Sequence, residues 1–122
     1  MSSCVAQQCI RSSYNFKGTS LTPFPGELIH RSSQAGGGVF ELRPNQAVTH
    51  LQLKVDFPAH YATPPAVVAS ATAVMNQILP VSVTFRETSD GKFQGCILTL
   101  LDDLPYNSVT YVSYIVRPTH HA

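Results

Sequence analysis

Hydrophobic and polar residues alternate along residues 50–57 of this chain. The apolar side chains of this segment would share one face of an extended strand and are Leu51, Leu53, Val55 and Phe57. A period of two is typical of a β-strand with one buried side and one side in water. Pro64 and Pro65 follow, and neither has a backbone N–H to donate to a neighbouring strand. The pattern therefore predicts a strand that ends before the double proline.

Strand signals continue through the second half of the chain. Residues 81–86 alternate Val, Val and Phe with Ser, Thr and Arg. Residues 89–92 (Ser-Asp-Gly-Lys) favour a hairpin turn because glycine accepts a positive φ, and residues 93–101 would form the returning strand. Residues 102–107 predict a polar loop, after which residues 108–117 close the sheet.

Residues 66–78 fit two different structures. Pro65 at a first helical position, with Val67, Ala71, Val74 and Ile78 along one stripe, is compatible with a helix. The β-branched pair Val67-Val68 favours a strand instead, and the later strands need a partner. We favour the strand and keep the helix as the alternative.

The last predicted strand carries large apolar groups on both faces. Its two alternating sets of side chains are Val109, Tyr111, Ser113 and Ile115, and Thr110, Val112, Tyr114 and Val116. A strand that is apolar on both sides is typically buried on both sides. In a two-layer protein the second face would then meet another subunit. We therefore expect a subunit interface, with the residues Tyr111, Tyr114, Val116 and Leu100.

Residues 1–47 lack the regular period of residues 48–122. Their aromatic and apolar residues stand among Ser, Gly and Pro, and we expect only short strands at 27–31 and 38–43. Two interpretations stay open for this part: edge strands that cover one end of the domain, or an extended arm that packs on a neighbour. The whole pattern predicts a single all-β domain, a small antiparallel β-sandwich of about six strands with an irregular N-terminal arm.

Composition narrows the range of partners. Charged residues make up only 12% of the 122 residues, and depletion of charge is a mark of interface cores. The net charge is +1 and the basic residues are scattered, which argues against nucleic acid as a partner. No apolar stretch is long enough to insert into a membrane, and the start of the chain is too polar for a signal peptide.

The three cysteines, Cys4, Cys9 and Cys96, do not predict a disulfide framework, because an odd count cannot pair completely. We expect free thiols, with a Cys9–Cys96 bridge as the alternative.

No pattern in the chain predicts catalysis, a metal site or a cofactor. Asp102 and Asp103 are adjacent, and adjacent loop residues diverge rather than form an acid–base pair. The histidines lack the spacing of metal ligands, and no phosphate-binding or nucleophile motif is present. We therefore expect a non-catalytic protein. If a ligand binds, loop residues with hydrogen-bonding groups are the candidates, namely Tyr106, Asn107, Asp102, Asp103, His60 and Tyr61.

Residues 57–68, Phe-Pro-Ala-His-Tyr-Ala-Thr-Pro-Pro-Ala-Val-Val, resemble the H-type lectin domain, which occurs in snail agglutinins, in discoidin and in phage tail proteins. The resemblance extends to Val81–Phe85, to Gly91-Lys92-Phe93 and to Tyr111–Tyr114. It implies a six-stranded antiparallel sandwich, a homotrimer, and a site for sugars of the N-acetylgalactosamine type at the subunit boundary.

The chain departs from that family where the sugar site would lie. It has no tryptophan, Leu100 and Leu101 occupy late-strand positions where the family has a Trp-His-type pair, and Pro80 stands near the place of an arginine. Sugar recognition needs an aromatic face and planar polar groups, and leucines supply neither. The resemblance therefore supports the scaffold and the trimer more than the sugar site.

These observations lead to one functional hypothesis and one alternative. The hypothesis is a homotrimeric structural or attachment subunit of a virion, such as a tail-fibre, adaptor or head-decoration protein, whose N-terminal arm contacts other virion subunits. The alternative is a lectin that binds a cell-surface glycan, with an extracellular or cytoplasmic location.

Overall fold

The computed structural model describes residues 15–33, 36–73 and 77–118, and these ranges contain nine β-strands and no helix. The strands are β1 (Lys17–Ser20), β2 (Gly26–Ser33), β3 (Gly37–Pro44), β4 (Gln52–Tyr61), β5 (Ala66–Thr72), β6 (Ile78–Leu79), β7 (Val81–Glu87), β8 (Phe93–Leu100) and β9 (Thr110–Arg117). The prediction of an all-β protein is confirmed, with more strands than the six expected. Since the described residues form no helix, none of them belongs to a helix that could cross a membrane.

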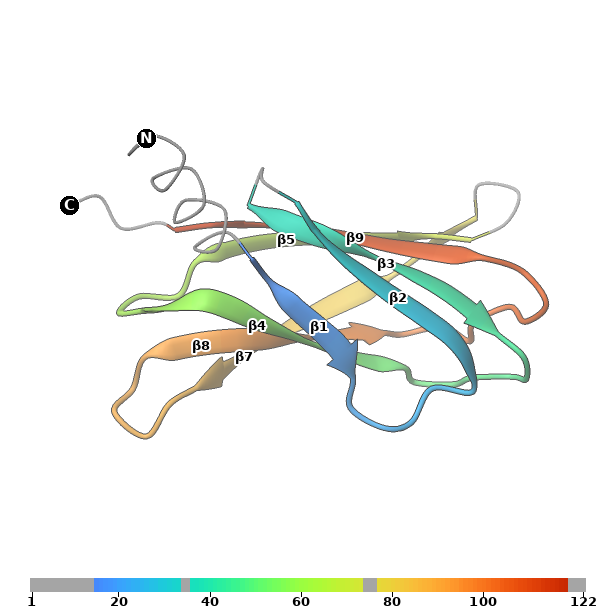
Figure 1. The fold of residues 1–122 in the computed structure, drawn as a ribbon, viewed down its shortest axis with the longest axis horizontal. Coiled ribbons are helices and arrows are strands. Elements are labelled where there is room, and N and C mark those ends of the chain that lie inside the picture. Colours follow the sequence, from blue (N-terminus) through green and yellow to red (C-terminus); the bar gives the residue numbers. More distant parts are fainter. Residues whose placement is uncertain (1–14, 34–35, 74–76, 119–122) are drawn as a thin grey trace, which may run out of the picture.

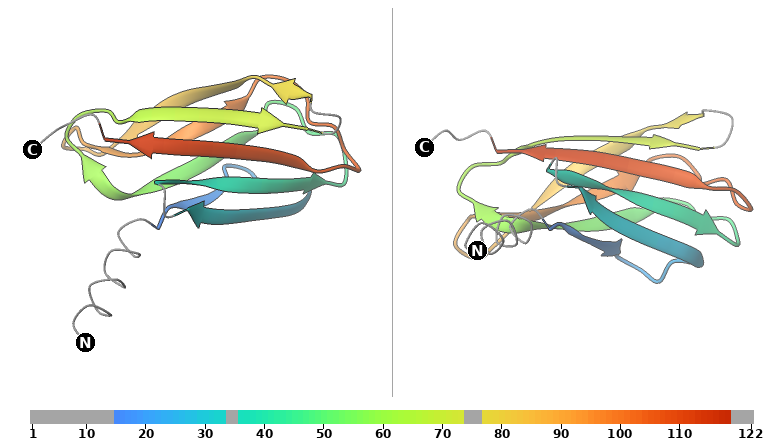
Figure 2. Two further views of the ribbon diagram at one scale, coloured as in Figure 1. Left: turned by 90° about the horizontal axis from the view of Figure 1, so that it is seen from above. Right: turned by 45° about the horizontal axis from the view of Figure 1, so that its top comes forward.

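The strands form two antiparallel sheets that pack as a sandwich (Figure 1). One sheet has four strands in the order β1-β4-β8-β7, and the other has five in the order β2-β3-β9-β5-β6. Figure 2 shows β9 between β3 and β5, in the interior of the five-stranded sheet. The antiparallel sandwich is therefore as predicted.

The core lies between the inward-facing sides of both sheets. The apolar positions predicted on one face of residues 50–57 are all buried there. They pack with the apolar positions of β8, among them Cys96 and Leu98, which are fully buried. The predicted alternation on this strand is thus confirmed, and it places Lys54 and Asp56 on the outer side of the four-stranded sheet.

Residues 66–72 form strand β5, as we favoured over the helix. The strand pairs with β9 without interruption from Ala66↔Arg117 to Thr72↔Tyr111. This pairing satisfies the backbone groups through β9, where a helix would satisfy them within the segment. Residues 74–76, the rest of the ambiguous segment, lie outside the described ranges.

The first 47 residues are less separate from the rest of the sandwich than predicted. The short strands expected at 27–31 and 38–43 are present as β2 and β3, and β1 and β2 do lie at sheet edges. However, β3 is an interior strand, and Phe16, Phe40 and Leu42 belong to the same hydrophobic core as β4 and β8. No boundary at residue 47 divides the sandwich. A projecting arm would have to lie within residues 1–14, which are outside the described ranges.

The predicted turn between β7 and β8 is confirmed. Gly91 has a φ of +82°, a conformation that glycine adopts without strain. The turn is closed by a hydrogen bond of 2.7 Å from the Thr88 N–H to the Lys92 carbonyl.

Three of the four predicted interface residues lie in the core of a single chain. Tyr114, Val116 and Leu100 are 1%, 4% and 0% exposed, so they cannot also meet a neighbouring subunit. The reason is the pleat of β9, which turns alternate side chains inward and the others outward. Tyr111 is on the outward side and is 46% exposed, so its interface role stays a prediction.

Two glycines make room for the packed rings of His30, Phe40 and Tyr114 at the β1–β2 side of the core. The His30 Nε2 and the Tyr114 hydroxyl are 2.6 Å apart and hydrogen-bonded, and the Phe40 ring lies 4.7 Å from the His30 ring. A Cβ added at Gly18 would come within 2.5 Å of Phe40, and one at Gly38 within 2.7 Å of the Tyr114 hydroxyl. Side chains at either position would therefore displace these rings.

Cys96 is a buried free thiol on β8. Burial raises the pKa of this thiol to about 12, so it stays protonated and unreactive at neutral pH. Cys4 and Cys9 lie outside the described ranges.

Replacing Thr110 with Val is expected to stabilise the protein by about 1 kcal/mol. Thr110 is fully buried on the inner face of β9, and its hydroxyl has no hydrogen-bond partner among the described residues. Valine keeps the shape and removes the buried polar atom. Urea unfolding would measure the change, with the exposed Thr84→Val as the control. A loss of stability in Thr110→Val without one in Thr84→Val would contradict this account.

Candidate functional site

The six residues predicted to bind a ligand do not come together. His60 and Tyr61 lie at the end of β4, where Tyr61 is paired with Phe93 at the start of β8. The other four lie in the connection between β8 and β9, which is anchored near the start of β4 by the Val48↔Leu104 bridge. The two groups are at opposite ends of the sandwich (Figure 1). They are separated by the length of β4, roughly 30 Å for ten extended residues.

The connection between β8 and β9 is held in place by contacts with the rest of the sandwich. Leu104 is buried, and the Asn107 N–H donates a hydrogen bond of 3.2 Å to the Pro44 carbonyl. Asp102 and Asp103 are exposed, and Tyr106 is 54% exposed. These four residues remain a weaker candidate than the sequence suggested, because His60 and Tyr61 cannot complete a site with them.

The half of the outer side of the five-stranded sheet that lies over strands β5 and β9 has few charges, and Arg117 at the end of β9 is one of them. We call this half the β5–β9 face, and its central side chains are Val68, Ser70, Thr72, Tyr111, Ser113 and Ile115. Val68 is directly paired with Ile115, and they are 69% and 44% exposed. Apolar side chains thus lie next to each other in water, with short hydroxyl side chains around them.

The other half of this outer side carries charge of both signs. Glu41 on β3 lies between two arginines, with Oε1 3.2 Å from Arg31 and Oε2 2.9 Å from Arg43. Hydrogen bonds from Arg31 and then Arg43 lower the pKa of Glu41. Glu27 lies 3.7 Å from Arg43 and extends the group. These four charged residues are therefore paired with one another beside the β5–β9 face, and Arg117 adds a charge at the end of β9.

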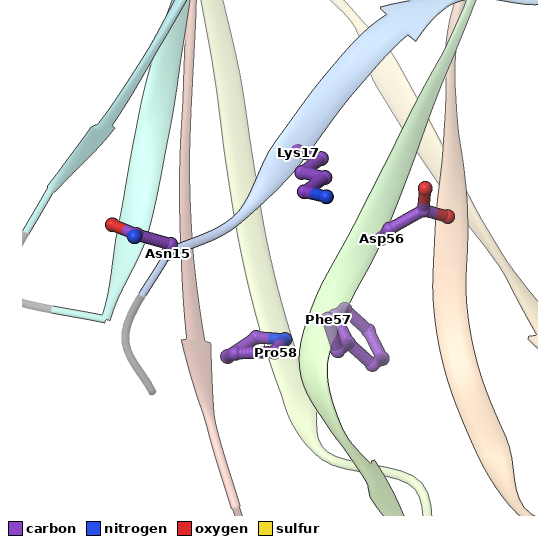
Figure 3. A pocket seen from close by; sticks show the side chains of 5 residues that line it. All are labelled: Asn15, Lys17, Asp56, Phe57 and Pro58. Atoms are coloured by element: carbon purple, nitrogen blue, oxygen red, sulfur yellow. The ribbon is translucent and has the colours of Figure 1, made fainter. Parts of the chain in front are cut away.

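A pocket opens on the four-stranded sheet, beside the start of β1. Its volume is about 490 Å³, and it is lined by Asn15, Lys17, Asp56, Phe57 and Pro58 (Figure 3). Lys17 and Asp56 are directly paired across β1 and β4, which brings an ammonium and a carboxylate to the same outer side. The pocket combines charged, amide and apolar groups.

Arg86 fixes the carboxylate at this pocket. It reaches Asp56 from β7, across the intervening β8, and its Nη1 lies 2.7 Å from the Asp56 Oδ1. The residue between them is Gly95, where an added Cβ would lie 2.9 Å from the Arg86 Nη1. A glycine in the middle strand therefore permits this ion pair.

The sequence did not reveal the pocket. Lys54 and Asp56 were recognisable only as the polar side of a strand, and nothing near Lys17 indicated its partner. The pairing register alone places Lys17 next to Asp56. Within the described ranges, no three His, Cys, Asp or Glu side chains gather closely enough to hold a metal ion.

No model of a known protein family matches the chain, and neither the curated proteins nor the solved structures contain a match. The resemblance to the H-type lectin domain is not tested by these comparisons and remains a resemblance.

The stability of the protein is expected to fall as the pH drops below about 6.5, because of His30. Burial lowers the pKa of His30 from that ordinary value, so the unfolded chain takes up a proton at a higher pH than the folded chain. The contribution of His30 is complete above pH 6.5 and is lost as the pH falls toward the folded-state pKa.

Urea unfolding as a function of pH would measure this effect in the wild type and in His30→Gln. The variant is expected to lose less stability on acidification, whereas the exposed His60→Gln should behave like the wild type. An unchanged pH profile in His30→Gln would contradict the assignment.

Proposed function

We propose that this chain is a non-catalytic subunit that assembles with copies of itself through the β5–β9 face. The observation that carries the proposal is the pair Val68 and Ile115, which are adjacent and exposed on the outer side of the sheet, with Arg117 beyond them at the end of β9. Side chains that face water on a strand are usually polar, so an apolar pair on the outer side requires another explanation.

The chemistry of the face favours association with another protein surface. Removing apolar area from water stabilises a complex by about 25 cal/mol per Å². Tyr111, on the same face, is of the residue type that is enriched at interfaces. The Ser and Thr side chains around these residues are short, which allows a second sheet to approach to the usual spacing of about 10 Å.

Association with a second copy is supported by the charge pattern. The chain has few charged residues, and four of them, Glu27, Arg31, Glu41 and Arg43, pair with one another at the side of the face. Because this group carries both signs, two copies of the surface would not repel each other. We retain the homotrimer and the role in a virion as parts of the proposal, on the strength of the low charge and the lectin-like sequence pattern alone.

The alternative of a glycan-binding lectin has less support. It used the loop residues Tyr106, Asn107, Asp102 and Asp103 together with His60 and Tyr61. Since these two groups lie at opposite ends of the sandwich, the two groups of one chain cannot bind the same sugar together.

Replacing Ile115 with Asp is expected to dissociate the assembly. The substitution puts a carboxylate in the middle of the face, next to Val68, where burial against a second copy would be costly. Sedimentation or light scattering should show a mass above that of the 13.3 kDa chain for the wild type and the mass of a single chain for the variant.

Leu101→Asp is the matched control, because Leu101 is 53% exposed and lies outside the face. This variant should assemble like the wild type. A wild type that stays monomeric at high protein concentration would refute the proposal, and so would an Ile115→Asp variant that assembles normally.

A further inference from the structure

The pocket beside β1 lies where the pairing of two strands ends. The pairing of β1 with β4 ends at Lys17↔Asp56, while β4 continues from Phe57 to Tyr61. The pocket lies where this pairing ends, with Asn15 on one side and Phe57 and Pro58 on the other (Figure 3). Its volume of about 490 Å³ falls in the range of small-molecule sites.

The charges at the pocket leave one cation uncompensated. The Asp56 carboxylate is already paired with Arg86 at 2.7 Å. Lys17 forms no ion pair with any of the described residues. The three groups together carry a net charge of +1, from two cations and one anion. An anionic ligand would therefore be favoured here. A cationic ligand would be repelled by Lys17 and would gain little from Asp56, whose charge is already compensated by Arg86.

The apolar wall of the pocket is packed against the core. The Phe57 ring is in edge contact with Phe16 at 6.2 Å and lies 5.5 Å from the Tyr61 ring. Phe57 is only 7% exposed, so its ring is held in the core and Pro58 completes the wall toward solvent. Such a wall can contact the C–H groups of a small carbon skeleton.

We propose that this pocket binds a compact carboxylate that carries hydroxyl groups, such as an acidic sugar or an open-chain hydroxy acid. The Lys17 ammonium would bind the carboxylate of the ligand through charge-assisted hydrogen bonds. The free lone pairs of the Asp56 carboxylate accept from a ligand hydroxyl, and the Asn15 amide can donate or accept. Pro58 and the edge of Phe57 contact the carbon skeleton.

This proposal is independent of the assembly proposed above. The pocket belongs to the four-stranded sheet, and the β5–β9 face is the outer side of the other sheet. If the assembly proposal fails, the ligand proposal is unaffected, and the reverse also holds. The Ile115→Asp variant should therefore retain ligand binding.

Titration of the full chain, followed by amide chemical shifts in NMR, tests the proposal directly. Glucuronate serves as the ring-shaped probe, gluconate as the open-chain probe, and glucose as the uncharged control. We expect saturable shifts of the amides around Lys17, Asp56 and Phe57 with at least one of the two carboxylates, and weaker or no shifts with glucose. The carboxylate that binds more tightly identifies which of the two shapes the pocket accepts.

Lys17→Met removes the charge and keeps an apolar side chain of similar length. We expect it to weaken binding of the carboxylate about tenfold or more, the usual effect of losing a hydrogen bond between charged groups. Lys54→Met is the matched control, because Lys54 lies on the same outer side but does not line the pocket. Equal binding of glucose and glucuronate, no saturable shifts with either carboxylate, or equal losses in the two lysine variants would overturn the proposal.

Discussion

The burial of one side of β9 is the constraint on which the rest of this structure depends. β9 runs through the interior of the five-stranded sheet, and its inward side chains Val112, Tyr114 and Val116 are at most 4% exposed. Tyr114 alone contacts His30 on β2, Phe40 on β3 and Phe16, which directly precedes β1. Because strands alternate their side chains, fixing this inner side also fixes Tyr111 and Ile115 on the outside. Core packing and the proposed assembly surface are thus set by the same strand.

The two outer sides of the sandwich have different chemistry. The five-stranded sheet offers exposed apolar groups on the β5–β9 face and pairs its charges at one side. The four-stranded sheet carries a row of charged groups from Lys17 through Asp56 to Arg86, with Gly95 between the last two. An apolar surface with few charges suits protein association, whereas a charged row beside a pocket suits a small polar ligand. This difference is the reason for proposing separate roles for the two layers.

The close approach of the two sheets at the β1–β2 side depends on glycine. Gly18 and Gly38 lie against the rings of Phe40, His30 and Tyr114 at distances that exclude a side chain. The hydrogen bond to the partly buried His30 gives a partner to the hydroxyl of Tyr114, which lies in the core, where an unpaired polar group would be costly. Neither glycine stands out in the sequence, because their role depends on strands that are far apart in the chain.

The sequence alone determined the features that depend on neighbouring residues. Alternation predicted the buried side of β4, the Ser-Asp-Gly-Lys segment predicted the turn at Gly91, and the double proline predicted the break before β5. Only the tertiary structure decided which side of β9 enters the core, that β3 is an interior strand, and that Lys17 lies next to Asp56. It also separated His60 and Tyr61 from the loop that follows β8. The physical reason is that propensity and periodicity act over a few residues, whereas strand order and register are set by side-chain packing between segments distant in the chain.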